Sequence, residues 1–218
     1  MRHNVENIER LLAAAAPGGK LLDLGCDDGS RTHAFAGAAG ASEVHGLELI
    51  EERAKIAEKR GVRIEIADLN ECFPYSDGTF DVVVSNQVLE HLWNVGNFLR
   101  ETCRVLRPGG IVVASTENLA SWHNVFALLF GWQPFSTTNV AREQLGLGNP
   151  LALHRGDGMG EPGWEHVQVF AYRGLGELFE SHGFVVERIE GAGYYPLPSV
   201  VGRHEPRHAA FLTLRGRR

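Results

Sequence analysis

Short apolar runs recur along the first half of the chain, and amphipathic segments separate most of them. The runs occupy residues 20–24, 44–48, 62–67, 80–86 and 111–116. Apolar or alternating runs of this length are typical of strands. Residues 5–15, 50–60 and 98–106 are predicted to be helices, the first because its apolar positions recur at helical spacing. Strands that alternate with helices predict an α/β protein with a doubly wound, mostly parallel sheet.

A long segment, residues 117–169, separates the fifth predicted strand from the next clear helix. Connections of this length are usually functional lids or disordered. Six large aromatic residues favour a packed segment here. They are Trp122, Phe126, Phe130, Trp132, Phe135 and Trp164. We expect an amphipathic helix over residues 119–130, and a flexible glycine-rich stretch over 146–163 that can close over a substrate.

The remaining pattern predicts a helix over residues 173–182 and two final strands over 184–189 and 209–214. With 218 residues and 44% hydrophobic content, the chain can bury one substantial core. A single domain over residues 1–218, with residues 117–169 as an insert or lid within it, therefore fits better than two domains.

A glycine turn follows the first strand, in the segment Asp23-Leu-Gly-Cys-Asp-Asp-Gly29. Its two glycines let the backbone approach a ligand that a Cβ atom would push away. The dinucleotide-binding fingerprint does not fit, because it needs glycine where Asp27 and Ser30 stand. The phosphate-binding P-loop does not fit either, because Lys20 is followed by leucine rather than by Ser or Thr.

The turn instead resembles the first motif of the class I S-adenosylmethionine-dependent methyltransferases, in which an acid and an apolar residue precede Gly-x-Gly-x-Gly. Asp27 replaces the middle glycine, and Asp tolerates a left-handed backbone better than most residues. The resemblance covers residues 20–116, including the Arg-Pro-Gly-Gly turn at 107–110. It implies a Rossmann-like methyltransferase fold of seven strands, with an antiparallel last strand and a helical insert after strand five. It also implies S-adenosylmethionine as the cofactor and S-adenosylhomocysteine as the product.

In similar proteins, acids at the ends of the first three strands hold the cofactor. The resemblance assigns Asp23 to the methionine end, Glu48 to both ribose hydroxyls and Asp68 to the adenine amino group. Leu49 and Leu69 would flank the adenine ring. Each acid also has a structural alternative, because Asp and Glu commonly cap turns and helices.

The segment after the fourth strand, Ser-Asn-Gln-Val-Leu-Glu-His-Leu92, lines the methyl-transfer face in similar proteins. His91 fits a packed structural histidine equally well, and Cys26 fits a small apolar spacer better than a nucleophile. The complete predicted cofactor-binding set is Asp23, Gly25, Cys26, Gly29, Glu48, Leu49, Asp68, Leu69, Asn86, Gln87 and His91.

Methyl transfer from a sulfonium is an in-line displacement, so the protein must align the reactants and exclude water. A hydroxyl acceptor also has to lose its proton, and histidine is the side chain most readily tuned for that role near neutral pH. His166 is the first candidate for the general base, because it precedes the helix that re-enters the fold, and His123 is the second.

No metal site is expected from the sequence. Glu117-Asn118 is similar to the acid-Asn pair that binds magnesium in catechol-type methyltransferases, but Ser85 or Asn86 stands where the companion Asp is needed. The Asn-Pro-Pro-aromatic motif of amino methyltransferases acting on adenine or glutamine is also absent, because Gln87 follows Asn86.

Composition is consistent with a cytoplasmic enzyme. The formal net charge of -6 argues against a nucleic-acid partner, and the basic residues 215–218 are expected to form a solvated tail. No apolar run approaches the length of a membrane span, and the N-terminus lacks a signal-peptide pattern. The three scattered cysteines favour a reducing compartment without disulfides.

The sequence therefore predicts methyl transfer to a small-molecule acceptor, at a hydroxyl oxygen. Residues 126–135 suggest a sugar or another glycan-pathway intermediate. Carbon or nitrogen methylation of a quinone-like or amine metabolite is one alternative. A catalytically silent cofactor-binding protein is another, because Asp27 interrupts the glycine motif. A short-chain oxidoreductase is excluded, since no lysine has a tyrosine four positions before it.

Overall fold

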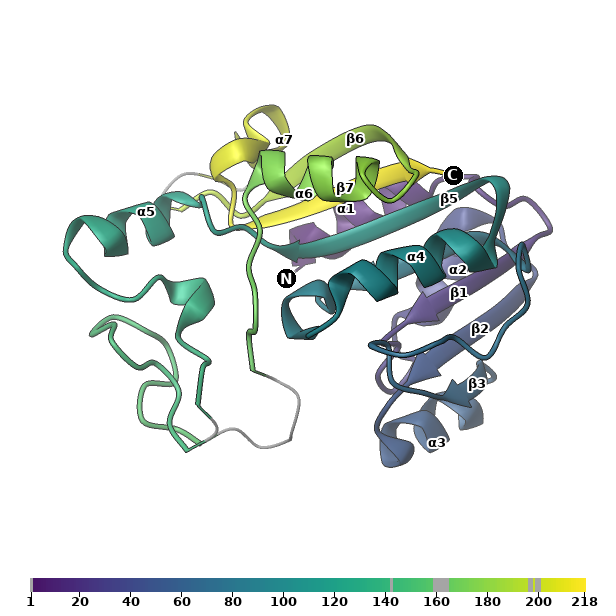
Figure 1. Cartoon of the computed structure of the whole chain (residues 1–218), viewed down its shortest axis with the longest axis horizontal. Coiled ribbons are helices and arrows are strands. Elements are labelled where there is room, and N and C mark those ends of the chain that lie inside the picture. The colour runs from purple at the N-terminus through teal and green to yellow at the C-terminus, as the bar shows by residue number, and fades with distance from the viewer. Residues whose placement is uncertain (1, 142, 159–164, 196–197, 199–200) are drawn as a thin grey trace.

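A seven-stranded sheet forms the centre of the molecule (Figure 1). The structure is a computed structural model that describes residues 2–141, 143–158, 165–195, 198 and 201–218. The strands are β1 Lys20–Leu24, β2 Glu43–Glu48, β3 Arg63–Ile66, β4 Phe80–Asn86, β5 Leu106–Glu117, β6 Val185–Ala192 and β7 Phe211–Arg217. The α-helices are α1 Arg2–Leu12, α2 Thr32–Ala39, α3 Glu51–Lys59, α4 Val95–Val105, α5 Trp122–Leu129, α6 Tyr172–Glu180 and α7 Val201–His204. Three short 3-10 helices are η1 Leu89–His91, η2 Phe135–Thr137 and η3 Pro206–His208.

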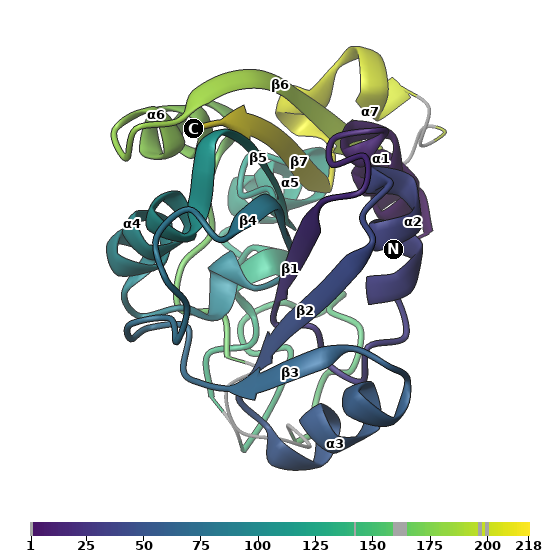
Figure 2. The same ribbon diagram turned by 90° about the vertical axis from the view of Figure 1, so that its right-hand side faces the viewer.

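The strands lie in the order β3-β2-β1-β4-β5-β7-β6 (Figure 2). β7 is antiparallel to both of its neighbours, whereas β1 to β5 pair in parallel. The chain proceeds outward from β1 to β3 and then returns to place β4 on the other side of β1. This reversal opens a crevice beyond the carboxyl ends of β1 and β4, where open α/β sheets bind ligands.

The two largest parts of the core lie on opposite faces of the sheet, because successive side chains of a strand point to opposite faces. In β1, Leu21 packs with residues of α1 and α2, including Phe35. Leu22 and Leu24 pack on the other face with residues of α4 and α6. A strand buried on both faces reads as a continuous apolar run, which is why β1 was recognisable from the sequence.

The predicted doubly wound sheet with an antiparallel last strand is confirmed, and the differences lie at element ends. The first helix was predicted to reach residue 15, but α1 ends at Leu12 and Ala14 has a positive φ of 52°. The turn predicted at residues 107–110 lies within β5. Phe80 pairs with Leu106 before it and Val82 pairs with Ile111 after it, with a shift in register between them.

The long segment after β5 leaves and rejoins the sheet at one place. Asn118 forms an isolated parallel bridge with Phe170, and the Leu119 amide donates to the Phe170 carbonyl at 3.0 Å. In Figure 1 the described residues between α5 and α6 lie to one side of the sheet. Residues 159–164 of the predicted glycine-rich stretch, and Trp164 with them, lie outside the described residues.

The prediction that the aromatic residues of this segment pack inside was wrong for α5 and the residue after it. Trp122 is 43% exposed, Phe126 47% and Phe130 58%. The buried positions of α5 are Asn124 and Ala127. Asn124 donates to the Asn118 carbonyl at 3.0 Å and to Ser136 Oγ at 2.8 Å, so polar contacts hold the inner side of this helix. Hydrophobic composition therefore predicted order here, but not which side chains face inward.

The basic C-terminus is also not a solvated tail. Arg215 and Arg217 are part of β7, and both form ion pairs with Glu187, at 2.7 and 2.6 Å. Within the described residues, no helix has both the length and the apolar character needed to cross a membrane.

Candidate functional site

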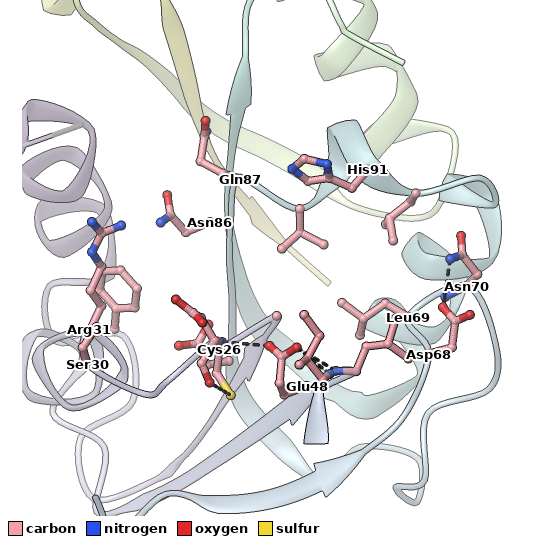
Figure 3. A pocket seen from close by; sticks show the side chains of 18 of the residues that line it. Cys26, Ser30, Arg31, Glu48, Asp68, Leu69, Asn70, Asn86, Gln87 and His91 are labelled. Atoms are coloured by element: carbon pink, nitrogen blue, oxygen red, sulfur yellow. Dashed lines mark hydrogen bonds between the residues drawn. The ribbon is translucent and has the colours of Figure 1, made fainter. Parts of the chain in front are cut away.

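A cavity of about 610 Å³ lies at the carboxyl ends of β1, β2 and β4. Ten of the eleven predicted cofactor-binding residues line it, and Gly29 is the exception. Figure 3 shows Glu48 and Asp68 on the opposite side of this cavity from Gln87 and His91. The structure thus brings together side chains from the ends of β1, β2, β3 and β4, the first and last of which are more than sixty residues apart in the sequence.

The turn after β1 has the backbone that the motif requires. Gly25 and Gly29 have φ values of 73° and 72°, and Asp27, in the place of the middle glycine, has a φ of 51°. A Cβ on Gly25 would lie 2.6 Å from Val88 Cγ2, so glycine is needed there for packing as well as for conformation. The Asp27 carboxylate lies 3.3 Å from the Arg53 guanidinium. This ion pair connects Asp27, with its left-handed backbone, to α3.

Glu48 is a buried carboxylate that organises the turn. Its Oε2 accepts a hydrogen bond from the Asp27 amide at 2.9 Å. Its Oε1 accepts from the Leu49 and Ile50 amides, both at 2.9 Å. A carboxylate has about four acceptor positions, so three are used by the backbone and about one is left for a ligand. Glu48 can therefore cap the turn and still bind a ligand.

Asp23 lies at the base of the cavity with an exposed fraction of 3%. Thr32 Oγ1 donates to its Oδ2 at 2.7 Å. The pKa of Asp23 is raised to about 7, mainly by burial, with the Thr32 hydrogen bond lowering it and the nearby Glu48 raising it by smaller amounts. A cationic ligand group at this end of the cavity would favour the ionised carboxylate.

Asp68 follows β3 and caps its own turn, as the structural alternative for this residue predicted. Its Oδ1 accepts from the Asn70 amide and from Asn70 Nδ2, both at 2.8 Å. Asn70 in turn accepts from the Trp93 amide at 2.8 Å. These hydrogen bonds connect the cavity wall that carries Leu69 to the segment that follows η1. The carboxylate still lines the cavity.

A buried asparagine of the first helix supports the wall that carries Asn86 and Gln87. Asn4 Nδ2 donates to Asn86 Oδ1 at 3.0 Å, and Asn4 Oδ1 accepts from Ser115 Oγ at 2.6 Å. Gln87 has a positive φ of 58°, which sharply turns the chain after β4. The leading helix therefore packs on β5, β6 and β7 and reaches the cavity wall through Asn4.

His91 and His166 lie together at the edge of the cavity, with ring centroids 5.0 Å apart. His91 Nδ1 lies 3.0 Å from the Glu165 carbonyl oxygen, and His166 Nδ1 lies 2.7 Å from the Ser136 carbonyl oxygen. A carbonyl only accepts, so each Nδ1 carries a proton, and in the neutral ring each Nε2 keeps its lone pair. Burial lowers the pKa of His91, and the neighbouring His166 lowers it further.

The two predicted bases have different surroundings. His166 Nδ1 lies 3.8 Å from Glu117 Oε2. His123 lies in α5, with its ring edge-on to Phe135 and Tyr195. Burial lowers the pKa of His123, while Glu117 raises it. Neither His166 nor His123 lines the cavity directly.

Sequence reasoning missed several residues of the site. Ser30, Arg31, Asn70 and Trp93 line the cavity. Ser30 and Arg31 directly follow the glycine motif, so their position in the sequence could have predicted that they line the cavity. Glu90 was not predicted as a site residue, although it directly precedes His91 in the sequence. It is 1% exposed and accepts from Thr116 Oγ1 at 2.7 Å, and burial raises its pKa to about 8.

Comparison with known proteins agrees with this geometry. A family model described as a methyltransferase domain matches residues 2–189. A probable S-adenosylmethionine-dependent methyltransferase of Mycolicibacterium smegmatis is 37% identical over 54% of this chain and 44% of its own length. The human mitochondrial ubiquinone biosynthesis O-methyltransferase is 27% identical over 82% of this chain and 45% of its own length. This chain thus spans about half the length of the curated relatives it matches.

Solved structures share the whole fold. An S-adenosylmethionine-dependent methyltransferase from Mesorhizobium loti superimposes with a TM-score of 0.67 at 22% identity, covering 99% of this chain and 98% of that one. A geranyl diphosphate C-methyltransferase from Streptomyces coelicolor, solved with Mg2+, geranyl diphosphate and S-adenosylhomocysteine, has a TM-score of 0.62 at 14% identity. It covers 100% of this chain and 80% of that chain. At these identities the structural likeness establishes the fold.

Proposed function

The chain belongs to the class I S-adenosylmethionine-dependent methyltransferases, and from that premise we propose that it methylates a hydroxyl oxygen of a small molecule. The observation that carries the proposal is the pair His91–His166 at the edge of the cofactor cavity, each with a free Nε2 lone pair. A hydroxyl acceptor needs such a base, because its proton has to leave as the new bond forms.

The cavity fits the cofactor in size and chemistry. Its volume of about 610 Å³ falls within the usual range for small-molecule sites. We propose that Glu48 accepts a ribose hydroxyl at its remaining acceptor position and that Asp68 accepts from the adenine amino group. Leu49 and Leu69 provide apolar contact to the ring, and Asp23 faces the methionine end. When bound, S-adenosylmethionine supplies the sulfonium methyl group.

The residues after β4 then face the transferred methyl group. Asn4 holds the Asn86 side chain, and the positive φ of Gln87 sets the direction of the backbone, so this wall is shaped before the acceptor arrives. Fixed groups of this kind reduce the cost of aligning the acceptor oxygen, methyl carbon and sulfur. Residues 117–169 are proposed to form the acceptor-side lid, which is anchored to the sheet where Asn118 and Phe170 pair.

We propose His166 as the general base and His123 as the second candidate. The Ser136 carbonyl fixes the His166 tautomer with Nε2 unprotonated, and Glu117 would stabilise the ring after it gains a proton. A base oriented by a carbonyl and a carboxylate follows the usual logic of an activated histidine. His91 stands between this base and the cofactor cavity.

Two classes of hydroxyl acceptor, phenolic or quinol-type hydroxyls and sugar hydroxyls, should be tested separately. A phenolic or quinol-type hydroxyl is favoured by the relatives named ubiquinone biosynthesis O-methyltransferases, which align over 82% of this chain. A sugar hydroxyl is the class suggested by residues 126–135. Phe135 and Tyr195 lie edge-on around His123, so aromatic side chains stand beside this candidate base and could contact a phenolic ring.

The direct experiment is a methyl-transfer assay with labelled S-adenosylmethionine and matched acceptor panels. Catechols and quinols, sugars, and amines are compared at equal concentration, each with its pre-methylated form as the control. We expect label on the hydroxyl acceptors only. Label on amines or ring carbons would support the nitrogen or carbon alternative. Tight cofactor binding with no transfer to any acceptor would favour the catalytically silent protein.

A further inference from the structure

Three potential metal ligands converge at the acceptor edge of the cavity. Glu90, His91 and His166 each offer one ligand atom, and these atoms lie within 4.8 Å of one another. Glu90 and His91 belong to η1, whereas His166 comes from the segment after β5, about 75 residues further along the chain. The cluster is held across this separation by hydrogen bonds from the Val167 and Gln168 amides to the Glu90 carbonyl, at 2.8 and 3.3 Å.

Both histidines have the second-sphere contacts typical of metal ligands. In metal sites a coordinating imidazole donates its other N–H to a carbonyl or carboxylate, which fixes the ring and raises its basicity. Here the Glu165 and Ser136 carbonyls accept from the two Nδ1 atoms. Both Nε2 lone pairs are consequently available, with ring orientations set by the protein.

Glu90 is a buried carboxyl group without a cationic partner. Its exposed fraction is 1%, and among the described residues no lysine or arginine pairs with it. The charge that acts on it is a second carboxylate, Glu117. Buried carboxyl groups are normally paired, protonated or bound to a metal ion. The Thr116 hydrogen bond occupies part of one oxygen and leaves acceptor capacity on the carboxyl group.

We propose that Glu90, His91 and His166 bind one divalent transition-metal ion of the zinc class, with its open position directed to the acceptor. Two imidazoles and one carboxylate form a known ligand set for catalytic zinc and for related ions. Ligands at about 2.1 Å from a tetrahedral ion lie about 3.4 Å apart, so atoms within 4.8 Å of one another need to close by up to about 1.4 Å. Long rotatable side chains such as Glu90 can provide this movement.

This inference rests on the proposed function and deepens it. A hydroxyl oxygen bound at the open position loses its proton more readily, because the ion lowers the pKa of a coordinated O–H group. The proton passes to water. The oxygen lone pair then forms the bond to the methyl carbon as the carbon–sulfur bond breaks and its electron pair returns to sulfur. His166 is a ligand in this form, and coordination replaces its role as a base.

The test is calorimetric titration of the chelator-treated chain with Zn2+, and in parallel with Mg2+, in the presence of S-adenosylhomocysteine. We expect one Zn2+ per chain. Glu90→Gln and His166→Ala should each weaken zinc binding by at least about 100-fold, because changes outside the ligands alone cost about 10–100-fold. Gln at position 90 can still accept from Thr116, so this variant should remain folded. His182→Ala, which removes a histidine of a different surface, should bind Zn2+ as the unaltered chain does.

Three results would overturn the proposal: no binding of Zn2+, Zn2+ binding that Glu90→Gln and His166→Ala leave unchanged, or binding of Mg2+ alone. Imidazole ligands favour zinc over magnesium, which makes the last result incompatible with this ligand set. Cofactor binding is measured in the same samples. A chain that binds S-adenosylhomocysteine but not zinc contradicts the metal site alone and leaves His166 as the base. A chain that binds neither contradicts the proposed function as well.

Discussion

Replacing Glu48 with glutamine is a sharp test of the cofactor assignment. The structure shows which hydrogen-bond acceptor positions of this carboxylate are occupied by the backbone and which one remains for a ligand. Three backbone amides occupy three of its acceptor positions, each at 2.9 Å. About one position is left for a ribose hydroxyl. A hydrogen bond to a charged acceptor contributes about 1.5–3 kcal/mol, so its loss should weaken S-adenosylmethionine binding by about 10–100-fold.

The same substitution has a predictable cost in stability. The amide oxygen of Glu48→Gln can still accept from Leu49 and Ile50, but its NH2 group then faces the Asp27 amide, and two donors meet. One unsatisfied buried donor costs about 1–3 kcal/mol of unfolding free energy. Calorimetric titration well below the melting temperature keeps the chain folded, so the two effects are measured apart.

Glu52→Gln is the matched control, because it removes the same charge from an exposed position on α3. It should change neither cofactor affinity nor stability appreciably. If folded Glu48→Gln binds S-adenosylmethionine within twofold of the unaltered chain, the ribose assignment is wrong.

Further predictions concern acid–base behaviour, catalysis and backbone strain. Burial raises the pKa of Asp23 from 3.8 to about 7, so the folded chain holds an extra proton in that window. The Asp23 contribution to the unfolding free energy should therefore fall as pH rises from about 4 to 7, and Asp23→Asn should remove that contribution and make the pH slope measured in urea titrations less negative; a slope equal to that of the unaltered chain would contradict it. His166→Ala should lower kcat by about 10²–10⁴ with cofactor affinity retained, and His123→Ala should lower it less; equal losses would reject His166 as the principal group. Gly29→Ala should lose about 1–3 kcal/mol of unfolding free energy, because φ is 72° and the new Cβ would lie 2.9 Å from Ala57 Cβ; an unshifted melting curve would refute this.

The sheet was predictable because its signals are local. β1 is buried on both faces and reads as an unbroken apolar run, and the acids Glu48 and Asp68 stand at strand ends, where a parallel sheet gathers them. The glycine motif also specified its own backbone, including the left-handed Asp27.

The acceptor side was less predictable because its contacts are distant in sequence. The ring contact between His91 and His166 depends on where the segment after β5 returns to the sheet, which no local pattern encodes. The aromatic residues of α5 carried a clear hydrophobic signal, yet the buried position Asn124 is polar. Composition indicates that a segment is ordered, whereas the facing of each side chain depends on its tertiary partners.

The most direct test of the cofactor site is a crystal structure of the chain with S-adenosylhomocysteine. We expect the ligand in the cavity between β1 and β4, with a ribose hydroxyl within hydrogen-bonding distance of Glu48 and the adenine amino group within that distance of Asp68. The sulfur atom should face Gln87 and His91. A ligand bound elsewhere, or one whose adenine and ribose leave both carboxylates without contact, would contradict the account.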